Sequence, residues 1–394
     1  MQTSQQVIDA LLRNKKAERY GLIEGPWAET MARWVREGYP THLVHKRVGQ
    51  SRWRSEDGMW DEIKEVKQEG DYEEPVPPSD YFGFDIVGTA GWFDWQPKRG
   101  VSDLIEETDE WEIRRNGGGA ALKYRKRKSG TPEHVDFLMS SREIWERDYR
   151  PHIVQWDPGR MGDLAEARKN TQEARDKHQW ISFGHMFIWE IARQTMGDIN
   201  LYSNLILDPG WIHDFNRVYT DMFKIGFDIL FKEVGKPDGI WFYEDMGYKA
   251  GLFASPKLFR ELIFPYYREM IEYFHSLDLP VLLHSCGSVA EALPLIVDVG
   301  FDALHPMERK AKNNDPFAFA DKYADKLTFI GGLDARTFES NDKDLLKREI
   351  TNYIEGMKAR GARLVFCSDH SLSPAVSFDT YKFAVDVFHD LMML

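Results

Sequence analysis

The chain has 394 residues, of which 42% are hydrophobic and 29% are charged, a composition typical of a soluble globular protein with one large domain or a few smaller ones. The formal net charge of -13 argues against a general nucleic-acid binder, because phosphate binding requires clustered Lys and Arg. No apolar run approaches the ~18 residues that a membrane span needs, and the first residues lack a signal-peptide pattern. We therefore expect a cytoplasmic protein.

Residues 1–175 are predicted to form an N-terminal extension with helices and a β insertion. The apolar segment 81–87 is a candidate strand of the main sheet. Within 88–140, the segments 111–115 and 120–125 flank an Asn-Gly-Gly-Gly turn, which predicts an antiparallel β hairpin. The highly charged segment 156–178 predicts a solvent-exposed helix that leads into the next domain.

Residues 176–394 repeat a unit made of a short apolar run, a loop and an amphipathic helix. Short continuous apolar runs are typical of strands buried on both faces of a parallel sheet. The six runs are residues 180–183, 239–243, 281–284, 303–305, 327–330 and 364–367. Six such units, with the remaining strands supplied upstream, predict an α/β fold of the (β/α)8 TIM barrel type.

Proline after a capping residue marks the start of three helices in this part of the chain. Asp208-Pro209, Ser255-Pro256 and Asp315-Pro316 each combine a side-chain acceptor at the N-cap with a residue that lacks a backbone N–H. Pro265 predicts a break within the second of these helices. Ser288 and Glu291 have the spacing of a capping box, which predicts a further helix start.

The only two cysteines follow two of the predicted strands. His284 and Cys286 are two residues apart, so on a strand they point to the same face and can converge on one ion. Cys367 ends another apolar run and would complete a His/Cys/Cys set. Zinc suits these ligands, and three of them leave a fourth position open for chemistry. Two buried core thiols without a metal are the alternative interpretation.

Further polar residues also fall at predicted strand ends, which in a barrel all meet on one face. Glu244 and Asp245 follow one strand, and they are equally compatible with loop carboxylates or a helix cap. The other members of this group are His305 and Glu308, and Asp369 and His370. The two histidines are also compatible with a purely structural role, and Glu308 with a solvent-exposed pair to Arg309 or Lys310.

Four segments together resemble the uroporphyrinogen decarboxylase superfamily, and within it the zinc-dependent methyltransferases that serve corrinoid proteins. They are Glu244-Asp245-Met246-Gly247 with Ser255-Pro256, Leu283-His284-Ser285-Cys286-Gly287, Gly331-Gly332-Leu333-Asp334, and Cys367-Ser368-Asp369-His370. The resemblance implies a TIM barrel and a zinc ion bound by His284, Cys286 and Cys367. The decarboxylase branch fits less well, because its N-terminal arginine-rich motif has no equivalent here.

The resemblance leads us to expect O-demethylation of a methoxylated aromatic, with the methyl group passed to the corrinoid (cobalamin) of a partner protein. Zinc would act as a Lewis acid on the ether oxygen, and Glu308 is the candidate fourth ligand. Glu244, Asp245, Asp369 and His370 are the candidate catalytic residues. Aromatic side chains near the strand ends are candidates for substrate binding, namely Phe183, Trp189, Trp241 and Tyr243.

Three other functions remain open at this point. The same zinc could activate a thiol for methylation by a methylated corrinoid protein. A tetrapyrrole decarboxylase is the second alternative. The third is a barrel that binds zinc without catalysis and only docks a partner.

Overall fold

The computed structural model describes residues 2–56, 59–126 and 132–394. Its centre is an eight-stranded sheet in which every pair of neighbouring strands is parallel. In sheet order the strands are β1 (Gly21–Leu22), β18 (Arg363–Phe366), β17 (Thr328–Ile330), β16 (Ala303–His305), β15 (Val281–His284), β12 (Gly239–Tyr243), β11 (Trp180–Met186) and β6 (Ile86–Ala90). The six predicted runs are therefore confirmed as strands.

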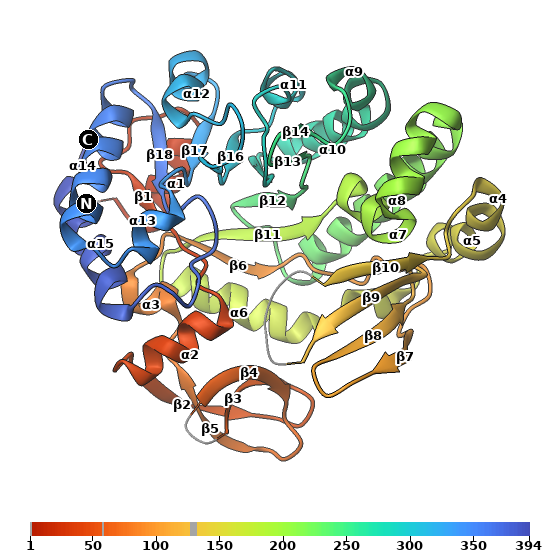
Figure 1. Cartoon of the computed structure of the whole chain (residues 1–394), viewed down its shortest axis with the longest axis horizontal. Coiled ribbons are helices and arrows are strands. Elements are labelled where there is room, and N and C mark those ends of the chain that lie inside the picture. Colours follow the sequence, from red (N-terminus) through yellow and green to blue (C-terminus); the bar gives the residue numbers. More distant parts are fainter. Residues whose placement is uncertain (1, 57–58, 127–131) are drawn as a thin grey trace.

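The sheet curls so that its first and last strands approach each other (Figure 1). The Asp85 N–H, just before β6, donates to the Leu22 carbonyl of β1 at 2.8 Å. The Asp85 carboxylate accepts the Leu22 N–H at 2.8 Å and pairs with Arg19 at 2.6 Å. Asp85 is fully buried. One acidic residue thus links the two edges of the curled sheet.

Helices surround the sheet on its outer side, as Figure 1 shows for the C-terminal part of the chain. They are α1 (Ser4–Leu12), α6 (Leu164–Asp176), α7 (Ile188–Leu207), α8 (Pro209–Glu233), α10 (Phe264–Ser276), α11 (Leu293–Val299), α12 (Pro316–Tyr323), α13 (Ala335–Glu339), α14 (Lys343–Lys358) and α15 (Phe378–Leu391). Among the helices of the described ranges, none is both long enough and apolar enough to cross a membrane.

Three predicted helix starts are confirmed, and one is wrong. The side chains of Asp208, Ser255 and Asp315 each accept a backbone N–H at the start of a helix. The short helix α9 (Pro256–Leu258) passes through a π-helical segment, Phe259–Ile263, into α10, which gives the predicted break beside Pro265. Ser288 caps no helix, because α11 begins only at Leu293. The Ser288 hydroxyl instead donates to the Lys312 carbonyl at 2.6 Å.

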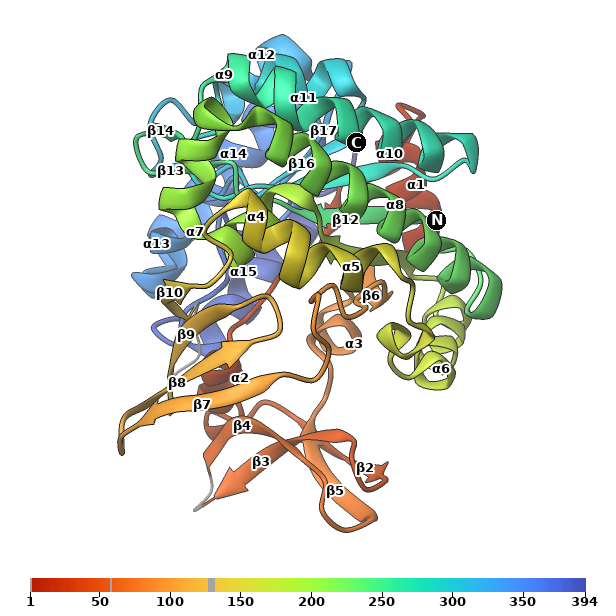
Figure 2. The same ribbon diagram turned by 90° about the vertical axis from the view of Figure 1, so that its right-hand side faces the viewer.

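The N-terminal part adds two antiparallel regions below the curled sheet (Figure 2). The predicted hairpin is present as β8 (Trp111–Asn116) and β9 (Ala120–Arg125), and β7 (Ser102–Glu107) and β10 (Glu133–Phe137) extend it to four strands. The second region contains β2 (Thr41–Lys46), β3 (Ser51–Glu56), β4 (Met59–Glu65) and β5 (Gly70–Pro75). Because β1 and β6 belong to the central sheet, residues 1–175 also build part of the main fold.

The remaining short elements are connections. They are α2 (Ala28–Arg36), α3 (Pro78–Phe82), α4 (Arg142–Ile144), a π-helical turn (Trp145–Tyr149), α5 (Arg150–Val154), a 3-10 turn (Pro158–Met161), β13 (Gly247–Tyr248) and β14 (Gly251–Leu252).

Candidate metal centre and adjoining cavity

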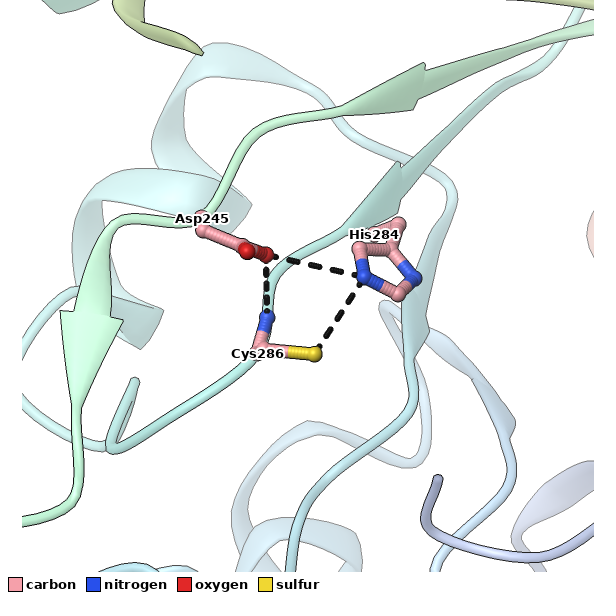
Figure 3. A group of neighbouring side chains, drawn as sticks. All are labelled: Asp245, His284 and Cys286. Carbon is pink, nitrogen blue, oxygen red and sulfur yellow. Dashed lines mark hydrogen bonds and ion pairs between the residues drawn. The ribbon is translucent and has the colours of Figure 1, made fainter. Parts of the chain in front are cut away.

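The carboxyl ends of β12 and β15 bring three ligand-type side chains together. The parallel register pairs Tyr243 with His284, so the residues that follow each strand lie side by side. The Asp245 carboxylate accepts the Cys286 N–H at 2.9 Å and lies 3.5 Å from His284 Nε2, and Cys286 Sγ lies 3.4 Å from the same nitrogen. Figure 3 shows the three side chains turned toward one point. Their ligand atoms all lie within 4.8 Å of one another.

A second group of ligand-type side chains shares the same thiol. Ligand atoms of Cys286, Glu308 and His370 also lie within 4.8 Å of one another. Glu308 follows β16, and its carboxylate is held in place by the Gly287 N–H at 2.9 Å. Thiolate, imidazole and carboxylate are the ligands that zinc prefers. Each of the two groups therefore has the chemistry to hold a zinc ion. Together they form the donor set: Asp245, His284, Cys286, Glu308 and His370.

Electrostatics at the donor set favour a bound cation. Burial, together with the carboxylates of Asp245 and Glu308, raises the pKa of the Cys286 thiol well above its ordinary value. Burial lowers the pKa of His284, although the same two carboxylates oppose that shift. The imidazole is thus neutral at pH 7, as a metal ligand must be, and binding a cation would release the thiol proton.

His305 orients His284 from behind. The Nδ1 atoms of the two rings lie 2.7 Å apart, so one ring must donate a proton to the other. Burial lowers the pKa of His305 well below its ordinary value, which keeps the ring neutral. If His305 Nδ1 is the acceptor, Nε2 of His284 keeps its lone pair facing the Cys286 thiol. A fixed tautomer of this kind is what partners of metal-binding histidines provide.

Cys367 does not belong to either group of described donor side chains. It follows β18, is 3% exposed, and lines a cavity of about 190 Å³ together with Trp241, Tyr243, His305 and His370. The structure therefore brings Cys367 to the cavity that adjoins the donor set, and its role as a zinc ligand stays a prediction.

Glu244 faces away from the donor set. It is fully buried, and its carboxylate accepts the N–H groups of Phe187 at 2.5 Å and Trp189 at 2.9 Å, together with the Tyr267 hydroxyl. These contacts make Glu244 a cap for the start of α7, which is the alternative interpretation that its sequence position allowed. Burial raises its pKa to about 8, while these hydrogen bonds oppose the shift.

Asp369 connects two loops beside the donor set rather than reaching into it. Its carboxylate accepts the Arg309 N–H at 2.7 Å and the Ala335 N–H at 2.8 Å. Arg309 directly follows Glu308, so this bond helps to hold the loop that carries Glu308. Asp369 is 2% exposed, and burial raises its pKa.

Strand alternation separates the four predicted substrate-binding aromatics. Trp241 and Tyr243 are two residues apart on β12, so both side chains point inward and line the cavity. Their rings are nearly parallel, with centroids 5.9 Å apart. Phe183 lies on the other side of β11 from the cavity residue Ser182, and its ring packs 6.4 Å from Phe231 of α8. Phe183 therefore does not line the cavity, contrary to the sequence-based expectation.

Trp189 supports the centre instead of lining the cavity. Its indole N–H donates to the Asp245 carbonyl at 2.8 Å, and its ring packs between Tyr202 and Phe259.

The sequence interpretation missed Glu24, whose carboxylate lines the cavity just after β1. It accepts hydrogen bonds from the Ser368 N–H, the Ser368 hydroxyl and the N–H of the next residue, Gly25, each at 2.9 Å. Burial raises its pKa to about 7. A strand of two residues leaves no periodic pattern that could have revealed this position.

Comparisons with known proteins agree with the C-terminal motifs. A model of the uroporphyrinogen decarboxylase (URO-D) family matches residues 243–391, a range that contains the whole donor set. This match confirms the predicted resemblance to the uroporphyrinogen decarboxylase superfamily over these residues. No curated protein matches the chain.

Among solved structures, a methyltransferase from Methanosarcina mazei is 14% identical with a TM-score of 0.60, covering 99% of this chain and 99% of that chain. The apo 3-keto-D-glucoside 4-epimerase from E. coli is 12% identical with a TM-score of 0.33, covering 64% of this chain and 91% of that chain. The first similarity shows a shared fold over nearly the whole chain, including the N-terminal part.

Proposed function

We propose that this protein is a zinc-dependent methyltransferase that transfers a methyl group from a methoxylated aromatic to a corrinoid protein. The observation that carries the proposal is the Cys286 thiol, shared by two groups of zinc-type ligands at the carboxyl ends of the strands. The full-length similarity in fold to a solved methyltransferase supports the reaction class. The URO-D match over the same residues supports the superfamily.

The proposed zinc ligands are His284, Cys286, Cys367 and Glu308. A zinc ion there would supply Lewis acidity at the ether oxygen of the substrate. Asp245 holds the Cys286 backbone, and His305 fixes the tautomer of His284. Asp245 and His305 thus position the ligands. Substitution of either residue should weaken zinc binding without abolishing it.

The cavity beside the ligands has the chemistry to hold an aromatic ring and the oxygen it carries. The parallel rings of Trp241 and Tyr243 offer a stacking surface. Among the described groups, the buried Trp241 indole N–H has no hydrogen-bond partner. The carboxyl of Glu24, with a pKa of about 7, can hold a proton near neutral pH and pass it to the oxygen of the leaving phenolate.

The cavity lining disfavours the decarboxylase alternative. Of the described residues that line the cavity beside the donor set, none is Lys or Arg. A tetrapyrrole with many carboxylates needs cationic partners, because an unpaired carboxylate is costly to desolvate. Glu24, whenever it is ionised, would add repulsion to such a substrate.

The test is an assay of the purified full chain with zinc, a reduced corrinoid protein and methoxylated aromatics. The expected result is formation of methylcobalt, which is monitored by its absorbance, together with release of the phenol. Zinc removal should abolish both, and zinc should restore them. Methylation of a thiol from methylcobalt, without any ether reaction, would refute this function in favour of the thiol alternative.

A further inference from the structure

A second cavity of about 380 Å³ adjoins the cavity beside the donor set. The two share Gly88, Ser182 and Tyr243 in their linings, so the tyrosine ring stands between them. The first cavity, at about 190 Å³, is smaller than most sites for drug-sized ligands, which begin near ~300 Å³. A ligand larger than a small ring would therefore extend into the second cavity.

Glycines keep the wall of the second cavity free of side chains. A Cβ on Gly91, which has a φ of +115°, would lie 2.4 Å from the Gly184 nitrogen. A Cβ on Gly184 would lie 2.9 Å from the Tyr243 ring. The backbone is thus packed too closely for larger residues, and Tyr243 is held against β11 at the junction of the two cavities.

An exposed tryptophan provides an apolar surface in the second cavity. Trp92 is 57% exposed, although its ring stacks 5.7 Å from Tyr243 and 4.9 Å from His185. Together, Trp92, Tyr243 and Trp241 form a row of near-parallel rings that continues from the second cavity into the first. A planar ligand can stack along this row.

The charges in the second cavity are all negative. Of the described residues that line it, Asp163 and Glu166 are the only charged ones. Asp163 caps α6 by accepting the Ala165 and Glu166 N–H groups, both at 2.9 Å, so the positive end of that helix is not available to a ligand anion. Within the described chain, the carboxylate of Glu166 and the amide of Asn170 have no hydrogen-bond or ionic partner and remain available for a ligand.

We infer that the second cavity binds the end of the substrate opposite its methoxy group and selects cationic or neutral hydroxylated substituents over carboxylates. This inference rests on the proposed function, since it assigns the ring of the methoxylated aromatic to the row Trp241, Tyr243 and Trp92. The ammonium or hydroxyl group lies against Glu166 and Asn170. A benzoate in the same orientation meets two carboxylates and no cation.

The test measures binding rather than turnover. Three probes differ only in the substituent opposite the methoxy group: para-methoxybenzylamine, para-methoxybenzyl alcohol and para-methoxybenzoate. Titration calorimetry on the full chain should give an amine affinity about tenfold higher than that of the benzoate, with the alcohol between them, as expected for solvent-accessible charge pairs. The difference should shrink at high salt.

Charge reversal at one position sharpens the test. Glu166→Lys should reverse the order of amine and benzoate, and Glu166→Gln should reduce the difference. Glu173→Lys is the matched control, because Glu173 lies on the same helix but outside the cavity, 3.7 Å from Lys169. It should leave the order unchanged.

Other outcomes would overturn either the charge selection of the second cavity or the proposed function. Benzoate binding as tightly as the amine, equal effects of Glu166→Lys and Glu173→Lys, or no binding of any probe would overturn the inference. The expected order of affinities without methyl transfer to a corrinoid protein would instead overturn the proposed function and leave the charge selection of this cavity standing.

Discussion

Glu244 and Asp245 are neighbours in the sequence, yet they belong to two regions that differ in burial and in the groups that face the carboxylate. The region behind β12 is closed: Glu244 is fully buried, and protein N–H and O–H groups saturate its carboxylate. The region in front is open: the Asp245 side chain is 38% exposed and faces an imidazole and a thiol. The first arrangement stabilises the fold, and the second presents ligand atoms to the proposed zinc ion.

The largest effect that separates the two regions is expected from Cys286→Ser. Because the thiol belongs to both groups of donor side chains, its loss should remove the metal and lower methyl transfer by at least about 100-fold, more than changes of supporting residues usually do. The melting temperature of the metal-free protein should hardly change, because a core of this size does not depend on a metal. Metal analysis, the methylcobalt assay and thermal melting check the three statements.

Cys367→Ser is the matched variant for that experiment. Loss of zinc from both variants supports ligation by both thiols. If the folded Cys367→Ser protein keeps one zinc per chain, Cys367 is not a ligand and the remaining ligands come from Asp245, Glu308 and His370.

The next largest effect concerns the closed region. Glu244→Ala leaves the Phe187 and Trp189 N–H groups and the Tyr267 hydroxyl buried without an acceptor, so the free energy of unfolding should fall by about 3 kcal/mol. For a chain of this size, that corresponds to a fall in melting temperature of about 4 °C. The folded variant should still bind zinc. A variant that keeps its stability but loses zinc would contradict the division between the two regions.

The sequence predicted the elements that carry strong local patterns. Residues 281–284 are continuously apolar, and Asp208-Pro209 combines a cap with a proline, so both the strand and the helix start were predictable. The two-residue strand β1 was not, and Glu24 was missed with it. Ser288 is not a cap because the chain after it turns before α11 begins at Leu293, and its hydroxyl donates to the carbonyl of Lys312, which is distant in sequence.

The candidate site was predictable as a group of residues but not as a geometry. The spacing of His284 and Cys286 was sufficient to predict their convergence. The opposite orientations of Glu244 and Asp245 and the outward position of Phe183 depend on which face of each strand is inward. A strand that is apolar on both faces does not reveal that in its sequence.

A pair of aromatic variants tests the same inward and outward division on neighbouring strands. Trp241→Leu removes a ring that lines the cavity, so the affinity for para-methoxybenzyl alcohol should fall by about tenfold. Phe183→Leu changes only packing against α8, so it should cost about 1 kcal/mol of stability and leave that affinity unchanged. Calorimetry and urea unfolding separate the two effects, and a loss of affinity in Phe183→Leu would contradict its outward position.

A further effect is expected in the pH dependence of stability. The pKa of Glu244 is raised from 4.5 to about 8 by burial, so between these values the folded state keeps a proton that the unfolded state releases. The free energy of unfolding should therefore fall as the pH rises through this interval. Glu244→Gln should flatten that slope in urea unfolding. Glu272→Gln, at an exposed position of α10, serves as the control for the loss of one carboxyl group.

The smallest effect is expected from Asp369, which acts on the open region through its neighbours. Its carboxylate accepts the N–H that follows Glu308 and the first N–H of α13, so Asp369→Asn replaces one of two acceptors with a donor that faces an N–H group. The loop that carries Glu308 loses its anchor while every ligand side chain remains. Metal affinity should therefore fall by about tenfold, the lower range for supporting residues around a metal, while the stoichiometry at saturating zinc stays the same. Asp334→Asn is the control, because Asp334 caps the same helix through the Arg336 N–H at 3.0 Å and, among the described residues, accepts no hydrogen bond from the Glu308 loop. If both variants weaken zinc equally, the effect comes from α13 as a whole and not from the bond between Asp369 and Arg309.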